Sequence, residues 1–173
     1  MSTKDFLKKI KDEDIEYVDV RFTDTRGKLQ HVTIVSDLVD EDFVEEGFMF
    51  DGSSIAGWKS IEASDMKLML DTDTAYVDPF YAEKTICVHC SVVEPDTGEA
   101  YERDPRGTAQ KAEAYLKASG IGDVAYMGPE AEFFLFDNVK FSNSINKVSY
   151  EVDASDASWN TDTDYEMGNM GHR

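Results

Sequence analysis

Positive charge and long apolar runs are both scarce in this sequence. Its 173 residues hold 17 lysines and arginines against 36 aspartates and glutamates, a formal net charge of −19. Such a surface repels the phosphates of nucleic acids and anionic membranes, and it favours cations, basic partners or simple solubility. No apolar run approaches the ~20 residues of a membrane span, and the charged opening MSTKDFLKKIKDED is unlike a secretory signal. We therefore expect a cytoplasmic protein with no nucleic-acid or membrane partner.

Cysteine and histidine are too few and too scattered to indicate a zinc site. Cys87 and Cys90 form a C-x-x-C within an expected strand, where residues three apart face opposite ways. No second pair completes four ligands, so we expect two reduced cysteines in a sheet. His31, His89 and His172 are dispersed along the chain, and neither a serine-nucleophile G-x-S-x-G nor a phosphate-binding G-x-x-x-x-G-K-[ST] is present.

The apolar content is sufficient for a packed core, and its patterning predicts a strand-rich first part. Hydrophobic residues make up 41% of the chain. Ser2 or Thr3 is a suitable cap for an opening helix. We expect further elements in this order: two strands within 15–35 around a turn at 25–27, a brief helix within 37–47, and strands near 66–70 and 85–93.

The clearest helix signal begins at residue 104. Asp104 is a suitable N-cap, Pro105 a suitable first helical residue, and Gly120 a suitable stop. An apolar stripe lies between them, formed by Ala109, Ala112, Tyr115 and Leu116. We place a domain boundary just before this helix, giving domains 1–103 and 104–173. The second contains one helix and one or two strands, too few to close a layered domain, and the last ~35 residues show only weak periodicity.

Two glutamates open the apolar stretch MGPEAEFFLF, which we expect to be a strand. Glu130 and Glu132 would then share one face, with Phe134 and Phe136 further along it. Like charges side by side need neutralisation, and Mg²⁺ and Mn²⁺ prefer carboxylate oxygens. The pattern therefore indicates a metal site or, alternatively, a solvated strand end at which both acids face water.

The Gly/Ser-rich loop FDGSSIAGW is the second candidate site. Gly52 and Gly57 permit unusual backbone conformations, while Asp51, Ser53 and Ser54 supply short polar groups. An ordinary turn, in which these side chains hydrogen-bond their own backbone, is the alternative interpretation.

Together these two stretches resemble the N-terminal portion of a type I glutamine synthetase. The likeness covers practically the whole chain. It is carried by Phe50-Asp51-Gly52-Ser53-Ser54 with Ser64-Asp65 after it, by Gly128 to Phe136 as Gly-Pro-Glu-x-Glu-Phe-Phe-x-Phe, by DPF at 78–80 and by RDPR at 103–106. The resemblance implies an α+β fold, with a β-grasp-like N-terminal domain followed by the incomplete beginning of a catalytic domain.

The resemblance also implies a function and a site. This family uses ATP to join ammonia to the side-chain carboxylate of glutamate through a γ-glutamyl phosphate. Two divalent cations, Mg²⁺ or Mn²⁺, take part, and by position Glu130 and Glu132 would each help hold one. Asp51 would bind ammonium and accept its proton, with Ser54 a weaker contributor. The family's loop serves the active site of a neighbouring subunit, which implies a ring-shaped homo-oligomer.

The length of the chain is the main departure from that family. Such enzymes are more than twice as long, so the other metal ligands, most of the nucleotide pocket and the glutamate-binding arginines would lie outside these 173 residues. We therefore expect the chain to be inactive alone. Two alternatives stay open, a stand-alone β-grasp module that docks on full-length subunits and a related γ-glutamyl–amine ligase.

Overall fold

The computed structural model describes residues 1–166 and 168. The chain forms two compact units, Met1–Ala125 and Tyr126–Arg173. No helix in the described part is long and apolar enough to cross a membrane. The domain boundary expected between residues 103 and 104 stays a prediction.

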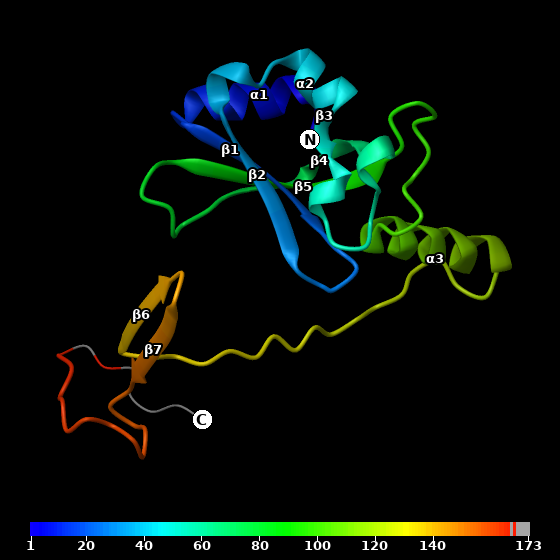
Figure 1. The fold of residues 1–173 in the computed structure, drawn as a ribbon. Helices are drawn as coiled ribbons and strands as arrows, with labels where there is room; N and C mark the ends of the chain where they lie inside the picture. The colour runs from blue at the N-terminus through cyan, green and yellow to red at the C-terminus, as the bar shows by residue number, and fades with distance from the viewer. Residues whose placement is uncertain (167, 169–173) are drawn as a thin grey trace. The chain divides into compact units, whose positions relative to one another are not determined.

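The first unit is built on one mixed five-stranded sheet (Figure 1). Its strand order is β2-β1-β5-β4-β3, in which β1 and β5 are parallel and all other neighbours antiparallel. The strands are β1 (Tyr17–Thr23), β2 (Leu29–Val35), β3 (Phe48–Asp51), β4 (Asp65–Val77) and β5 (Thr85–Val93). The strands expected within 15–35 and near 66–70 and 85–93 are confirmed, and β4 extends well beyond its predicted end.

The hairpin of β1 and β2 turns where the sequence predicts. The Asp24 side chain accepts hydrogen bonds from the backbone N–H groups of Arg26 and Lys28, at 2.8 and 3.0 Å. Gly27 has a φ of 81°, which few other residues adopt without strain. The turn residues themselves therefore determine the register of the pair.

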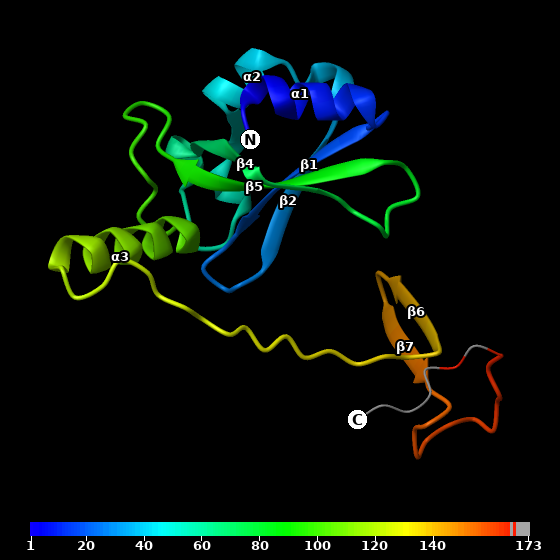
Figure 2. The ribbon, with the colours of Figure 1, turned by 180° about the vertical axis from the view of Figure 1, so that it is seen from behind.

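Two helices cover one face of the sheet, as Figures 1 and 2 show. They are α1 (Thr3–Asp12), whose N-cap Ser2 accepts from the Asp5 N–H, and α2 (Glu41–Glu46). Both confirm the predicted helices. The core beneath them includes Phe6 and Ile10 of α1, packed with Val18 and Val20 of β1. Short 3₁₀ turns η1 (Ser36–Leu38), η2 (Gly52–Ser54) and η3 (Ile61–Ala63) complete the connections.

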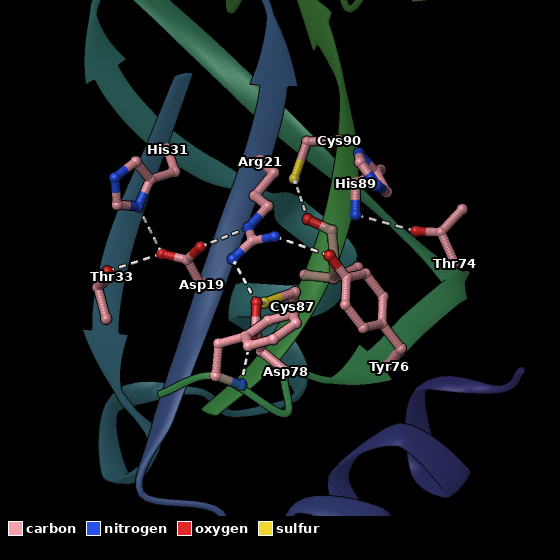
Figure 3. Close-up of polar contacts among 12 residues, drawn as sticks. Asp19, Arg21, His31, Thr33, Thr74, Tyr76, Asp78, Cys87, His89 and Cys90 are labelled. Carbon is pink, nitrogen blue, oxygen red and sulfur yellow. Dashed lines mark hydrogen bonds and ion pairs between the residues drawn. The ribbon is translucent and has the colours of Figure 1, made fainter. Parts of the chain in front are cut away.

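A polar network occupies the other side of β1 (Figure 3). Asp19 is fully buried, and its Oδ2 accepts a hydrogen bond from Arg21 Nε at 2.6 Å. Its Oδ1 accepts from Thr33 Oγ1 at 2.7 Å and lies 2.7 Å from His31 Nδ1. Arg21 also donates to Asp78, at 3.1 Å. Strand alternation explains why Asp19 and Arg21 share this side of the strand.

Helix α3 (Pro105–Ser119) also belongs to the first unit and confirms the predicted helix. The Asp104 side chain caps it by accepting from the Arg106 N–H, and its other oxygen accepts from the Val92 N–H at 3.0 Å. One buried carboxylate therefore joins the helix start to β5. The apolar stripe on α3 is mostly exposed; Tyr115, for example, is 76% accessible.

The second unit contains a hairpin that the sequence interpretation missed. Strands β6 (Asn138–Ser144) and β7 (Lys147–Asp153) pair antiparallel around a two-residue turn. After them the Asp153 side chain accepts from Thr161 Oγ1 and from the Tyr165 hydroxyl, the latter at 2.9 Å. Residues 138–153 therefore pair regularly although the sequence there shows only weak periodicity.

Candidate functional site

The loop after β3 places a carboxylate at the edge of the sheet. Asp51 is the last residue of β3 and lies opposite Asp65 of β4. Its Oδ1 accepts hydrogen bonds from the Ser53 N–H at 2.8 Å and from Ser53 Oγ at 2.6 Å. The Gly52 N–H donates to the Ser64 carbonyl at 2.7 Å. This small hydrogen-bonded turn orients the Asp51 carboxylate, which stays exposed.

These contacts favour the ionised form of Asp51. The hydrogen bond from the Ser53 hydroxyl, followed by that from the Ser53 backbone, holds the pKa of the Asp51 carboxyl below its usual range, and the Ser64 side chain adds to the effect. At neutral pH the side chain is therefore an anion able to attract a small cation. The ordinary-turn alternative describes the loop's hydrogen bonds correctly, but the exposed anion is also available for binding.

Ser53 is the residue that sequence reasoning undervalued. We expected Ser54 beside Asp51, whereas Ser53 makes both hydrogen bonds to its carboxylate and Ser54 is exposed. A serine two residues after an aspartate is a common way to close such a turn, and that spacing was a usable signal. The expected contribution of Ser54 stays a prediction.

Gly52 is required where the loop leaves the sheet. A Cβ at this position would lie 2.3 Å from Met66 Sδ and 2.7 Å from Met66 Cγ. Because Met66 is fully buried, it has little room to move away. We expect Gly52→Ala to lower the free energy of unfolding by about 1–3 kcal/mol, the usual cost of overpacking, as measured by urea denaturation.

Gly107→Ala is the matched control for Gly52→Ala. Its added Cβ would meet its nearest neighbours at 3.5–3.7 Å, which is ordinary contact, and it lies within α3, where alanine is favoured over glycine. Equal destabilisation by the two substitutions would contradict this account of Gly52.

The prediction of a strand at Glu130 and Glu132 is wrong. Residues 123–136 form neither helix nor strand. A strand is defined by backbone hydrogen bonds to a neighbouring strand, which an apolar alternation alone does not provide. Both glutamates are exposed. Phe134 and Phe136 nevertheless lie on the same side of the segment, as predicted, since their rings stack with centroids 6.2 Å apart.

The glutamate pair supplies the type of ligand that a hard divalent cation prefers, but too few ligands to complete a site. Carboxylate oxygens suit Mg²⁺ and Mn²⁺, yet an octahedral site needs about six oxygens. Within residues 1–166 and 168, no group of three or more His, Cys, Asp or Glu side chains could hold a metal ion. Asp51 belongs to the first unit and the two glutamates to the second. The roles expected for these residues therefore stay predictions.

The two cysteines and His31 do not form a metal or redox site with other described residues. Cys87 and Cys90 are free, buried thiols, which confirms the expected reduced pair. Burial raises the pKa of Cys87 to about 11 and that of Cys90 to about 12, so neither is a thiolate at neutral pH. His31 is engaged with Asp19, as described above. His172 lies outside the described residues.

Family models and known proteins agree on what this chain resembles. The model described as glutamine synthetase, beta-Grasp domain, matches residues 14–95, and the model described as glutamine synthetase, catalytic domain, matches residues 102–170. A glutamine synthetase of Cereibacter sphaeroides is 74% identical over 169 residues, covering 98% of this chain and 36% of that relative. One from Rhodobacter capsulatus is 69% identical over 172 residues, covering 99% and 39%.

A solved structure supports the fold. The cryo-EM structure of Plasmodium falciparum glutamine synthetase matches with a TM-score of 0.67 at 23% identity, covering 88% of this chain and 29% of that one. The chain spans little more than a third of the length of the curated relatives named above. With two successive domain matches and relatives this similar, the chain belongs to the glutamine synthetase family, and the expected α+β fold with a β-grasp domain and the beginning of a catalytic domain is confirmed.

Proposed function

We propose that this chain forms part of an ATP-dependent glutamate–ammonia ligase that makes glutamine through a γ-glutamyl phosphate. The single observation that carries the proposal is the exposed, ionised Asp51 carboxylate, oriented by Ser53 in a chain of this family. An oriented carboxylate attracts ammonium in its charged form and can accept the proton that ammonium must lose before it attacks. Ser54 would assist from the same loop.

The two glutamates are proposed as partial metal ligands. Glu130 and Glu132 would each contribute a carboxylate to one of two divalent cations, Mg²⁺ or Mn²⁺. Such cations neutralise the charge that develops on phosphate oxygens during phosphoryl transfer. This chain's own part is to supply two anionic oxygen donors on an exposed segment. The proposed enzyme binds glutamate, ammonium and ATP, assembles as a ring of identical subunits and resides in the cytoplasm.

A chimera tests the proposal directly. Residues 1–173 would replace the matching third of the Cereibacter sphaeroides enzyme, to which they are 74% identical. We expect the chimera to assemble and to form glutamine in an ATP-dependent manner. A chimera that reaches the parent's molecular mass but forms no glutamine would count against the proposal.

The isolated chain is expected to be inactive. Two carboxylates without further ligands hold Mg²⁺ weakly, so calorimetry should detect at most millimolar binding, and glutamine formation should stay at background. Glu130→Gln is a suitable comparison, because it removes one of the two proposed carboxylate ligands and should weaken the residual binding while leaving the far-ultraviolet circular dichroism unchanged. Glutamine production that copurifies with the 173-residue chain would overturn this expectation.

The alternative of a docking module has one supporting observation. Met1–Ala125 form a compact unit with its own buried core. Mixing the chain with the intact Cereibacter sphaeroides enzyme and measuring particle mass and activity separates the two ideas. Incorporation into the particle, or inhibition of its activity, would favour the docking module. The absence of both effects would favour the ligase fragment.

A further inference from the structure

A groove beside the first helix is unrelated to the residues proposed for ligase chemistry. It has a volume of about 650 Å³ and lies between the C-terminal half of α1 and the segment that runs from η1 into α2. Both ribbon views place α1 and α2 side by side over the sheet (Figures 1 and 2). The groove therefore opens on the helical side of the first unit.

The floor of the groove is apolar. Its lining includes Leu7 and Ile10 from α1, Ile15 from the following loop, and Val39 between η1 and α2. Leu7 is half-buried, whereas Ile10, Ile15 and Val39 are 5–7% exposed and form the bottom of the groove. A concavity with apolar side chains at its bottom is typical of a binding groove.

The rim of the groove is acidic. Asp14, Asp37, Asp40 and Glu41 line it, against the single base Lys11. None of these four acids forms an ion pair within the described part of the chain. For the three acids on the α2 side the local sequence explains why, since residues 29–58 contain no lysine or arginine. The rim therefore carries four acids and one base, a net negative charge.

We propose that this groove binds a basic amphipathic segment of another protein. Its leucine-like side chains would cover the apolar floor, and its lysines or arginines would lie against the acidic rim. Apolar anchors in a groove are a recurrent mode of peptide recognition. Complementary charge speeds association and sets specificity. The same field repels nucleic acids and anionic lipids, which leaves a cationic peptide as the matching partner.

A synthetic peptide tests the groove on the full 173-residue chain. The probe is a fluorescent 14-residue peptide of leucine and lysine with its leucines at helical spacing, and binding is followed by anisotropy at low and high salt. We expect micromolar affinity that weakens with salt. The double variant Asp37→Asn, Glu41→Gln should weaken binding about five- to tenfold, because it removes two rim charges. A peptide with glutamate in place of lysine should not bind.

Two further variants separate the groove from general attraction to an acidic protein. Glu45→Gln with Glu46→Gln removes equal charge from α2 at positions that do not line the groove, so affinity should change less than twofold. Leu7→Ser should weaken binding severalfold by removing an apolar contact. Equal losses from the two charge pairs, or no effect of Leu7→Ser, would overturn the proposal. Self-association that Leu7→Ser abolishes would also overturn it, since a second copy would then occupy the groove.

Discussion

Asp19→Ala is expected to lower the free energy of unfolding by about 2–6 kcal/mol, because it leaves two buried donors without an acceptor at about 1–3 kcal/mol each. Asp19 has no exposed surface, and Arg21 beside it is only 12% exposed. Removing the carboxylate leaves the Arg21 Nε–H and the Thr33 hydroxyl without their acceptor. A domain of this size has a total stability of roughly 5–15 kcal/mol, so the loss is large. Urea denaturation of the full chain measures it.

Two comparisons make the Asp19 result specific. Asp19→Asn keeps an acceptor oxygen but removes the charge, so it should lower the free energy of unfolding less than Asp19→Ala does. Asp12→Asn breaks an exposed helical pair with Lys8 and should have little effect. An Asp19→Ala variant as stable as Asp12→Asn would mean that the network around β1 contributes nothing.

The Asp19 contribution should also depend on pH. Burial raises the pKa of the Asp19 carboxyl, but hydrogen bonds from Thr33, Arg21 and His31 together outweigh burial and hold that pKa below its usual range. A carboxyl whose pKa is lower in the folded state contributes stability above its unfolded pKa of about 4 and loses it as pH falls further. The difference in free energy of unfolding between the wild type and Asp19→Asn should therefore be largest near pH 7 and should decrease below about pH 4.

Asp51→Asn, made in the chimera, is expected to reduce kcat/KM for ammonium by about 10²–10⁴, the range of a lost general base. The amide has nearly the same shape but neither attracts a cation nor accepts a proton. The Ser53 hydrogen bonds can still form to its carbonyl oxygen, so the loop should stay folded. Steady-state kinetics with ammonium as the varied substrate measures the loss.

The choice of amine distinguishes chemistry from folding in this experiment. Hydroxylamine is largely uncharged at neutral pH and does not have to be captured as a cation. Asp51→Asn should therefore retain more activity with hydroxylamine than with ammonium. The control Asp42→Asn removes a charge from α2 and should leave both rates unchanged. Equal losses with the two amines would indicate a structural role for Asp51 alone.

Local signals explain which elements could be predicted from the sequence. Ser2, Asp104 and Gly120 are capping residues whose chemistry acts within a few positions, and the helices they border were predicted correctly. The β1–β2 turn is likewise set by Asp24 and Gly27. These interactions form whatever the rest of the chain does, so residue type and spacing suffice to find them.

Elements defined by a distant partner were harder to predict. Strand β3 has only four residues and exists because it pairs with β4, beginning opposite Leu68. The β6–β7 hairpin has an alternation of Val139 and Phe141 against Val148 and Tyr150 that was overlooked among polar residues. The strand predicted at Glu130 is wrong for a related reason, because its apolar pattern does not by itself specify a neighbouring strand, and the structure has none of its strands there. The metal-binding role expected for Glu130 and Glu132 stays a prediction, which rests on the carboxylate pair and on the family resemblance.

Because Tyr17 of β1 pairs with Thr85 of β5, the centre of this sheet cannot form early during synthesis on the ribosome. The middle of the sheet closes only when β5 has left the exit tunnel, about seventy residues after β1. Until then the apolar side of the first hairpin has no central strand beside it, and distant pairings of this kind form slowly. A nascent chain whose β5 is still inside the tunnel therefore exposes that apolar side of β1 and β2 to water and to other proteins.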